Sequence, residues 1–352
     1  MEKLERILSR ITPVDTNAAE EAQKHLDNLT KPPGSLGVLE EIVVRMAGIT
    51  GQAKPALPKK TAILMAGDHG VTDEGISAYP KEVTPQMVLN FLSGGAAMNV
   101  LARHAGAELV VVDVGVAADL PEHPLLVNKK VAYGTANMAK GAAMSREQAV
   151  AALEAGIEVA ESCLANGTGI FATGEMGIGN TTPSVALTAF YHGCGAAAVC
   201  GRGTGVDDAG FRHKVQVVET ALAVNKPDAA DALDVLAKIG GLEIAGMAGV
   251  MLAAAAHRVP VLVDGFISGA AALIASRLHP LAAQYMLASH LSEEPGHAAV
   301  LEILGLTPFL QMRMRLGEGT GAALAMTMVD AALKIAHEMA SFAEAGVSQN
   351  TD

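Results

Sequence analysis

Residues 61–70 read TAILMAGDHG, a continuous apolar run from Ala62 to Ala66 that stops at Gly67, Asp68 and His69. A short apolar run bounded by turn residues is typical of a strand that is buried on both faces of a parallel sheet. In an open parallel sheet, ligands bind outside the carboxyl ends of the strands. The run therefore predicts a buried strand whose end, with its polar residues, belongs to a functional edge.

The same form recurs four times, each time after a segment of helical character. The apolar runs and the residues after them are 109–112 with Asp113-Val114-Gly115, 170–172 with Thr173-Gly174-Glu175, 196–199 with Cys200-Gly201-Arg202-Gly203, and 261–263 with Asp264-Gly265. One intervening helix opens with Ser145-Arg146-Glu147-Gln148, which fits a capping box. Repeated strand–helix units predict an α/β fold, with an open, mostly parallel, Rossmann-like sheet and helices on both faces.

The two ends of the chain have helical spacing instead. Residues 1–49 are interrupted by the rigid turn Lys31-Pro32-Pro33-Gly34-Ser35, and residues 50–60 form a linker. After Pro308 the chain is helical again, with a long Ala- and Met-rich helix expected at 321–345. We expect residues 1–49 and 309–352 to form a small helical domain beside an α/β catalytic domain at 61–308.

Composition narrows the classes of function. The 352 residues carry 37 acidic and 25 basic side chains, and the net charge of -12 predicts no nucleic-acid partner and no membrane-surface partner. Apolar stretches such as 247–256 fall short of the ~20 residues that a membrane helix needs, and the N-terminal segment lacks the apolar region of a signal peptide. Cys163, Cys194 and Cys200 include no CxxC pair, as expected for a protein of the reducing cytoplasm.

Two glycine-rich turns at predicted strand ends are candidates for binding an anion. The first, 174–183, reads GEMGIGNTTP and leads into a helix, and the second, 201–205, reads GRGTG. Glycines let the backbone turn sharply and present N–H groups, and a helix N-terminus adds positive potential. Arg202 and Lys214 lie nearby in the sequence and could clasp a sugar phosphate. Ordinary tight turns with a threonine cap and solvated cations remain the alternative.

Glu318 stands among three glycines in the segment 315–321, RLGEGTG, just before the long C-terminal helix. A carboxylate flanked by glycines can reach a ligand, and desolvation by that ligand would raise its pKa toward that of a useful general base. The helix N-terminus would have the opposite effect on the pKa. The pattern by itself leaves a catalytic base and a helix-capping residue as equal alternatives.

Taken in order, several motifs resemble those of the nicotinate-nucleotide:dimethylbenzimidazole phosphoribosyltransferase family, whose members make the lower-ligand nucleotide of cobalamin. The motifs are KPPGSLG at 31–37, AGDHGV at 66–71, EVT at 82–84, VDVG at 112–115, GEMGIGNTT at 174–182, GGLEIAGM at 240–247, DGF at 264–266 and the segment 315–324. The match runs from about Ile11 to Ala345, which is nearly the whole chain.

The resemblance implies a reaction between small molecules, without cofactor, metal or covalent enzyme intermediate. Nicotinate mononucleotide would give its phosphoribosyl group to 5,6-dimethylbenzimidazole with inversion at the anomeric carbon, which yields α-ribazole 5′-phosphate and nicotinate. Holding two flat rings on either side of one ribose is largely a positioning problem. In the family a glutamate of the RLGEG motif takes the benzimidazole proton, so the resemblance assigns this role to Glu318 and places Glu175 near the reacting ribose. It also implies a homodimer.

The other site residues implied by the resemblance fall into two groups. Those expected at the phosphoribosyl group are Gly174, Gly177, Gly179, Asn180, Thr181, Gly203, Lys214 and Asp264. Those expected at the benzimidazole are Tyr79, Gln86, Met176 and Leu316. Where some members of the family have Ile-Ser-Pro before Glu-Val-Thr, this chain has Ala78-Tyr79-Pro80. A tyrosine in place of the pocket serine would change which lower-ligand base fits.

Two other functions stay open at this point. A phosphoribosyltransferase with a diphosphate donor would need an acidic stretch for Mg²⁺, and the nearest candidate is Asp207-Asp208. A nucleotide sensor would use the same glycine turns without catalysis. No metal site is predicted at His290 and His297 or at Asp68-His69, because neither pair has the spacing of a known metal motif.

Overall fold

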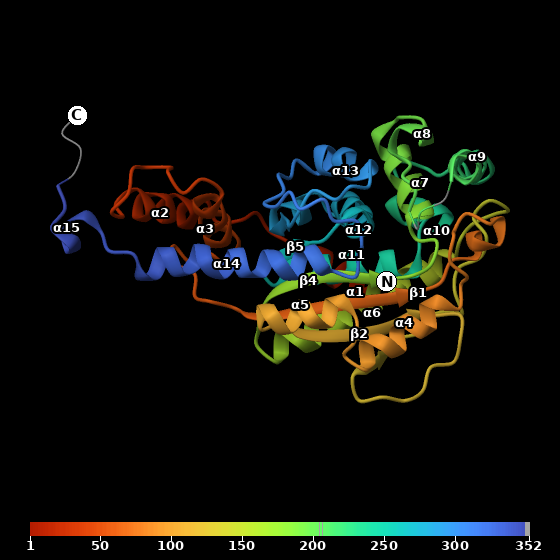
Figure 1. Ribbon diagram of the computed structural model, residues 1–352, viewed down its shortest axis with the longest axis horizontal. Helices are drawn as coiled ribbons and strands as arrows, with labels where there is room; N and C mark the ends of the chain where they lie inside the picture. Colours follow the sequence, from red (N-terminus) through yellow and green to blue (C-terminus); the bar gives the residue numbers. More distant parts are fainter. Residues whose placement is uncertain (204, 206, 349–352) are drawn as a thin grey trace.

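The computed structural model describes residues 1–203, 205 and 207–348, which fold around one parallel sheet of six strands in the order β3-β2-β1-β4-β5-β6 (Figure 1). Thr204 of the second glycine turn and residues 349–352 of the C-terminal segment lie outside the described residues. The strands are β1 (Lys59–Gly67), β2 (Glu108–Gly115), β3 (Leu126–Asn128), β4 (Thr168–Met176), β5 (Val261–Val263) and β6 (Met286–Ala288). Each neighbouring pair of these strands runs parallel, which confirms the predicted α/β sheet.

The strand order reverses between β1 and β4. From β1 the chain moves outward to β2 and β3, then returns to β4 and continues to β5 and β6 on the other side. Such a reversal opens a crevice at the carboxyl ends of the two central strands, where sheets of this kind bind ligands. The register pairs Met65 with Glu175 and Ala66 with Met176, so Glu175 lies at the carboxyl end of β4 beside the end of β1.

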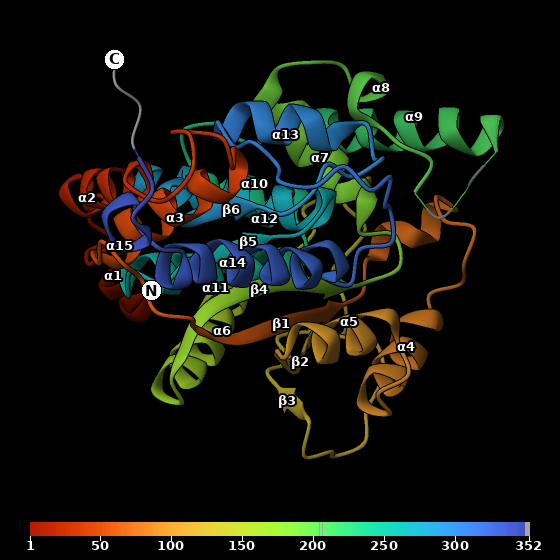
Figure 2. The ribbon, with the colours of Figure 1, turned by 60° about the vertical axis from the view of Figure 1, so that its left-hand side comes forward.

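Two layers of helices enclose the sheet (Figure 2). The α-helices are α1 (Glu2–Leu8), α2 (Thr16–Asp27), α3 (Val38–Thr50), α4 (Val83–Leu92), α5 (Ala97–Ala105), α6 (Arg146–Ala165), α7 (Thr181–His192), α8 (Ala196–Val199), α9 (Asp208–Asn225), α10 (Ala232–Ile239), α11 (Leu242–Ala256), α12 (Phe266–Leu278), α13 (Gly296–Leu304), α14 (Thr320–Glu338) and α15 (Phe342–Ala345). The short 3-10 helices are η1 (Gly70–Glu74) and η2 (Pro280–Tyr285). One layer holds α4, α5 and α14, and the other holds α6, α11 and α12.

Helix α11 is enclosed on all sides, and every one of its 15 residues is buried. It approaches α6 so closely that a Cβ on Gly156 would lie 1.9 Å from the carbonyl oxygen of Gly246, and a Cβ on Gly249 would lie 2.0 Å from that of Leu153. The two backbones are therefore in direct contact, which uses the small side chains of this chain for dense packing. Neither α11 nor another helix of the described residues has both the length and the apolar composition of a bilayer-spanning segment.

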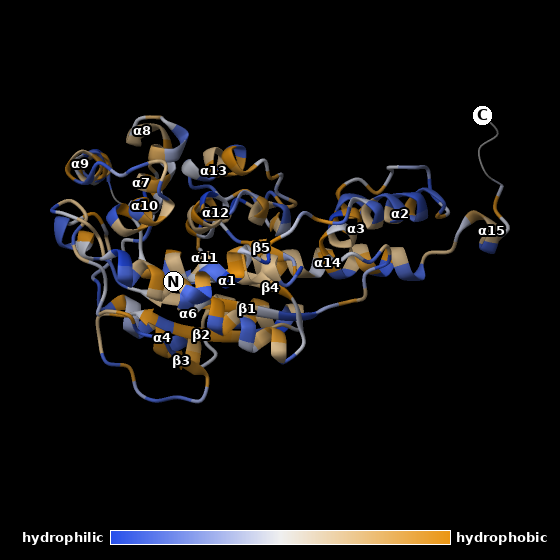
Figure 3. Ribbon diagram, turned by 180° about the vertical axis from the view of Figure 1, so that it is seen from behind, coloured by the Kyte–Doolittle hydropathy of each residue, from blue (hydrophilic) through white to orange (hydrophobic). Residues whose placement is uncertain are grey.

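Helices α2 and α3 lie beside the C-terminal part of α14, at the end of the molecule away from the carboxyl ends of β1 and β4 (Figure 1), whereas α1 packs against α6 and α11. Helix α3 packs against both α2 and α14, and the N–H of Thr30 donates to the carbonyl oxygen of Ala340 at 3.0 Å. When the ribbon is coloured by hydropathy, hydrophobic residues dominate the central strands and hydrophilic residues are frequent in α2 (Figure 3). The buried side chains Ala18, Ala22 and Leu26 form the inner face of α2.

Two predictions of secondary structure were wrong. Residues 196–199, expected as a strand, form the helix α8, because an apolar run of four residues does not distinguish strand from helix and its three alanines favour helix. The C-terminal helix, expected to reach residue 345, ends at Glu338, and Met339 has extended backbone geometry. Strands β3 and β6 were missed, since each is an edge strand of only three residues.

The remaining predicted strands and the capping box are confirmed. The apolar runs at 62–66, 109–112, 170–172 and 261–263 are all parts of strands, namely β1, β2, β4 and β5. The hydroxyl of Ser145 accepts a hydrogen bond from the N–H of Gln148 at 3.2 Å, at the start of α6.

Candidate active site

A pocket of about 530 Å³ lies at the carboxyl ends of β4 and β5. Its walls come from the segment between η1 and α4, the turn after β4, the start of α12, the segment after β6 and the segment before α14. The lining residues are Ile76, Ser77, Tyr79, Val83, Met87, Glu175, Met176, Gly177, Ile178, Gly179, Asn180, Thr181, Gly203, Asp264, Gly265, Phe266, Ile267, Ser268, His290, Ser292, Glu294, Arg315, Leu316, Gly317 and Glu318. Most of the residues that the resemblance implied therefore surround one cavity.

Two glutamates meet where the end of β4 contacts the segment before α14. The N–H of Glu318 donates to Oε1 of Glu175 at 3.1 Å. A Cβ on Gly174 would lie 2.3 Å from the carbonyl oxygen of Glu318, and a Cβ on Gly317 would lie 2.3 Å from Oε1 of Glu175. Gly174 must be glycine because a side chain there would meet the backbone of Glu318, and Gly317 must be glycine because its φ of 85° is strained for any other residue and a Cβ would displace the carboxyl of Glu175.

Glu175 is almost fully buried, with 6% of its surface exposed. Its Oε2 accepts a hydrogen bond from the side-chain amide of Asn180. Burial raises the pKa of Glu175 to about 8, although its hydrogen bonds with Asn180 and Glu318 act in the opposite direction. At neutral pH this carboxyl therefore keeps its proton and can donate a hydrogen bond.

Glu318 is also buried and has left-handed backbone geometry, with φ 62°. Its Oε2 accepts a hydrogen bond from the N–H of Met98, in the first turn of α5, at 3.1 Å. The N-cap of α14 is Gly319, so Glu318 does not cap the helix that follows it. Burial raises the pKa of Glu318, the hydrogen bond from Met98 lowers it, and the charge of Asp264 raises it further. Glu318 Oε1 makes no hydrogen bond with the described residues, which leaves it available to a ligand.

The two glycine turns meet around a buried cation. Lys214 of α9 is only 1% exposed, and its ammonium donates to Oγ1 of Thr181, the first residue of α7, at 2.6 Å. A Cβ on Gly203 would lie 3.0 Å from Nζ of Lys214. Burial lowers the pKa of Lys214, and the nearby Cys200 and Glu294 act against this. A lysine beside a helix N-terminus and two glycine turns can hold an anion such as a phosphate.

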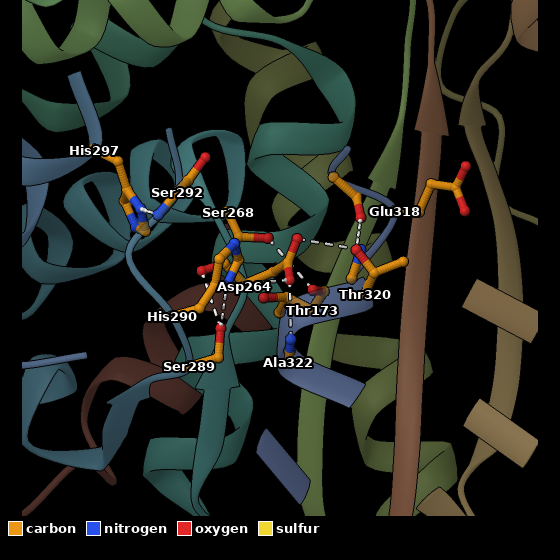
Figure 4. Close-up of polar contacts among 12 residues, drawn as sticks. Thr173, Asp264, Ser268, Ser289, His290, Ser292, His297, Glu318, Thr320 and Ala322 are labelled. Carbon is orange, nitrogen blue, oxygen red and sulfur yellow. Dashed lines mark hydrogen bonds and ion pairs between the residues drawn. The ribbon is translucent and has the colours of Figure 1, made fainter. Parts of the chain in front are cut away.

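Asp264 follows β5 and lies among polar groups (Figure 4). Its Oδ1 accepts a hydrogen bond from the N–H of Ala322 at 2.9 Å, and its Oδ2 accepts one from the N–H of Gly319 at 3.3 Å. Nδ1 of His290, just after β6, lies 3.9 Å from Oδ1. The hydroxyl of Ser289 bridges the two, at 3.0 Å from Nδ1 of His290 and 3.2 Å from the carbonyl oxygen of Asp264. The carboxylate thus caps α14.

The opposite side of the pocket is apolar and open. Tyr79 and Leu316 line it with 56% and 58% of their surfaces exposed. Met176 lines it as well, and α4 contributes Val83 and Met87. These exposed and half-buried side chains form a surface against which a flat aromatic ring can stack.

Three residues expected at the site do not line the cavity. Gln86 is exposed on α4, where the neighbouring Met87 faces the pocket instead. Gly174 lies beneath Glu318 and makes room for it. Lys214 lies behind Thr181 and contacts the cavity through that residue.

Several lining residues were missed by the sequence analysis, among them His290, Ser292, Glu294 and Arg315. They come from the segment after β6 and the segment before α14. Because β6 was not predicted, its carboxyl end was not recognised as part of the functional edge. A polar cluster after a three-residue apolar run is the signal that could have found them.

No cluster of three or more His, Cys, Asp or Glu side chains that could hold a metal ion occurs among the described residues. Nδ1 of His297 accepts a hydrogen bond from the N–H of Ser292 at 3.0 Å, and His69 pairs with Glu243 at 2.8 Å. Asp207 caps α9 by accepting a hydrogen bond from the N–H of Gly210. These side chains therefore have structural hydrogen bonds.

The chain is similar to known proteins over its whole length. A family model described as phosphoribosyltransferase matches residues 11–347. A protein of Chloroflexus aggregans named nicotinate-nucleotide–dimethylbenzimidazole phosphoribosyltransferase is 57% identical over 100% of both chains. One of the same name from Geobacter sp. is 56% identical over 99% of this chain and 100% of its own. A crystal structure of a Thermus thermophilus protein, again of this name, superimposes with a TM-score of 0.91 at 47% identity, covering 96% of this chain and 100% of that one.

We expect Glu175→Gln to change how stability depends on pH. The pKa of Glu175 is raised from 4.5 to about 8, so between these values the folded state holds a proton that the unfolded state releases. This contribution to stability is complete below the lower value and is lost as the pH rises through the higher one. The glutamine variant has no such loss, so its free energy of unfolding relative to wild type should rise across this pH range.

Urea unfolding at several pH values measures this difference. Glu21→Gln, at an exposed position on α2, is the control for replacing a carboxyl as such. A difference between Glu175→Gln and wild type that stays level from pH ~5 to ~8 would contradict the raised pKa.

Proposed function

The chain belongs to the family of nicotinate-nucleotide–dimethylbenzimidazole phosphoribosyltransferases, and from this we propose that its pocket moves the phosphoribosyl group of nicotinate mononucleotide to 5,6-dimethylbenzimidazole. The products are α-ribazole 5′-phosphate and nicotinate, and the reaction contributes to cobalamin synthesis. One observation carries the proposal. Two buried glutamates lie in one cavity between a glycine turn backed by the buried Lys214 and an apolar surface.

The proposed reaction breaks one bond and forms one bond at the anomeric carbon. A benzimidazole nitrogen attacks that carbon with its lone pair, and the glycosidic bond breaks so that its electrons neutralise the pyridinium nitrogen of the departing nicotinate. Attack opposite to the leaving group inverts the centre from β to α. The second ring nitrogen of the benzimidazole loses its proton to Glu318, which acts as a general base.

The two glutamates would have different tasks because their surroundings differ. With its pKa near 8, Glu175 keeps a proton and donates a hydrogen bond to the ribose. Glu318 lines the same cavity and follows Leu316, a residue of the apolar wall, by two positions, so its carboxyl would reach an acceptor ring stacked on that wall. Carboxyls with separate protonation states in one site are a common basis for acid–base catalysis.

The phosphate of the donor would bind at the start of α7. Thr181 and the glycines at 177, 179 and 203 line the cavity there, and Lys214 supplies a positive charge behind them. This arrangement fixes one end of the ribose, so that the anomeric carbon is presented to the acceptor.

The acceptor would stack in the apolar part, between Tyr79, Met176 and Leu316. Gln86 belongs to this proposal only if α4 moves when the base binds, since its side chain is exposed and lies outside the cavity wall.

Assembly and location remain predictions. The resemblance implies a homodimer, and we propose that this chain forms one. The free cysteines Cys163, Cys194 and Cys200 suit the reducing cytoplasm, where we propose that the enzyme acts. The division into a helical domain of 1–49 and 309–352 and a catalytic domain of 61–308 is also proposed.

One incubation tests the function. Purified protein, nicotinate mononucleotide and dimethylbenzimidazole are combined with and without EDTA, and the products are separated by chromatography. We expect α-ribazole 5′-phosphate and nicotinate in equal amounts, at the same rate in both samples. A rate that collapses with EDTA would favour the diphosphate-donor alternative, and binding without turnover would favour a nucleotide sensor.

Glu318→Gln keeps the shape of the side chain but removes the base. General-base assistance is typically worth about 10²–10⁴-fold, so kcat should fall by that factor while binding of nicotinate mononucleotide changes little. The acidic limb of the kcat/KM profile should disappear with the base. Glu21→Gln on α2 serves as the matched control. A folded Glu318→Gln variant with most of its kcat intact would transfer the role of the base to Glu175.

Lys214→Ala should raise the KM for nicotinate mononucleotide. A charge-assisted hydrogen bond contributes roughly 1.5–3 kcal/mol, which corresponds to a change of about 10–100-fold. Lys24→Ala, exposed on α2 and remote from the cavity, is the control. An unchanged KM for a folded Lys214→Ala variant would remove Lys214 from the phosphate site.

A further inference from the structure

The geometry points to Asp264 as a positioning residue for Glu318, which it holds in place through the backbone of the segment before α14. The resemblance had implied a contact between Asp264 and the phosphoribosyl group. The new assignment rests on the proposed function, because it presumes that Glu318 is the base. Asp264 would act on the reaction through the protein, without touching the substrate.

Both oxygens of Asp264 are engaged by the segment that carries Glu318. Oδ2 accepts from the N–H of Gly319, the residue next to Glu318, and Oδ1 accepts from the N–H of Ala322, one turn of helix later. Glu318 itself has a left-handed backbone, with φ 62°. A non-glycine residue in this geometry is strained and persists only where its surroundings hold it. The two hydrogen bonds to Asp264 are such a constraint.

A second set of contacts fixes Asp264 in turn. Its side chain comes from the end of β5, and His290 from the end of β6 lies 3.9 Å from Oδ1. A Cβ on Gly321 would lie 2.0 Å from Nδ1 of His290, so this ring also packs against the start of α14 (Figure 4). The residues that follow β5 and β6 therefore hold the start of α14 in place. The position of Glu318, just before α14, is fixed relative to the sheet in the same way.

The hydrogen bonds also indicate the charge of Asp264. An ionised carboxylate accepts hydrogen bonds at both oxygens, whereas a protonated one must donate from one of them. Burial raises the pKa of Asp264, whereas the charge of His290 and the N–H groups of Ala322, Gly265 and Gly321 lower it and favour the ionised form. Glu175 also accepts two N–H donors, but after burial the neighbouring carboxyls of Asp264 and Glu243 raise its pKa further. The charged or titratable groups that face Asp264 are His290 from the segment after β6, Glu175 from β4 and Glu318 from the segment before α14.

This charge bears on the proton affinity of the base. After burial, the negative charge of Asp264 is the influence that raises the pKa of Glu318, while the hydrogen bond from Met98 lowers it. Removal of the charge with retention of the side-chain shape should therefore lower the pKa of Glu318. A charged residue remote from Glu318 would not have this effect, and a residue that bound the ribose would also change the KM for nicotinate mononucleotide.

Asp264→Asn tests the assignment, with Asp264→Glu as a second variant. For Asp264→Asn we expect kcat to fall by about 10–10²-fold, as for a small misplacement of a reacting group, and the KM for nicotinate mononucleotide to stay unchanged. The acidic limb of the kcat/KM profile should move to lower pH. Asp264→Glu retains the charge but moves it, so its kcat should fall while the limb stays where it is.

Asp113→Asn is the matched control. Asp113 is a buried carboxylate at the end of β2 that accepts a hydrogen bond from the N–H of Val116 at 2.9 Å, and it lies outside the wall of the candidate site. This variant should leave kcat and the acidic limb unchanged. Thermal unfolding is measured for all three variants. If Asp264→Asn unfolds while Asp113→Asn folds, Asp264 supports the whole fold and the assignment is overturned.

Two more outcomes would overturn it. A higher KM for nicotinate mononucleotide with an unchanged kcat in Asp264→Asn would mean that Asp264 binds the substrate directly. An acidic limb that does not move would mean that the charge of Asp264 does not affect the pKa of Glu318. If the wild-type enzyme shows no turnover, the proposed function fails independently. Titration of the Glu318 carboxyl by ¹³C NMR, assigned with the Glu318→Gln variant, then still decides whether Asp264→Asn lowers its pKa.

Discussion

The contact between the end of β4 and the segment before α14 leaves no room for a side chain. Gly174 lies against the carbonyl group of Glu318, and Gly317 lies against the carboxyl group of Glu175. A hydrogen bond across this contact joins residues 143 positions apart in the sequence. Glycine loses more conformational entropy on folding than other residues do. At these positions it nevertheless lets two acidic residues from distant segments approach one cavity.

The contact also separates the cavity into two environments. On the inner side, Glu175, Asp264 and Glu318 are 2–7% exposed, so the removal of water strengthens the electrostatic effects among them. On the outer side, Tyr79 and Leu316 are more than half exposed. Proton transfer needs a fixed, dry environment, whereas a flat apolar ring needs only a surface on which to stack. The cavity offers each substrate group the environment that its chemistry requires.

The sequence predicted the parts of this arrangement that repeat or that carry a distinctive motif. Apolar runs followed by polar turns identified β1, β2, β4 and β5, because buried parallel strands have continuous hydrophobic character. The same reasoning failed at 196–199, where alanines in a run of four formed a helix, and it missed the edge strand β6, which is too short to show a pattern. His290 was then rejected as a metal ligand but not recognised as a neighbour of Asp264. Contacts between backbones, such as that of Gly174 with Glu318, depend on the tertiary fold, and no local pattern in the sequence predicts them.

The position of α14 has a consequence for the growing chain on the ribosome. This helix covers one side of β4 and β5 and packs on α5, yet its residues are synthesised after all six strands of the sheet. Until they emerge, the apolar surface of these strands lacks its cover, and exposed surface of this kind makes nascent chains prone to aggregate. Domains that depend on contacts between distant segments also fold slowly. Chaperone binding during translation should therefore persist until residues 320–338 have left the exit tunnel, and catalytic competence should arise in the same event that completes the fold.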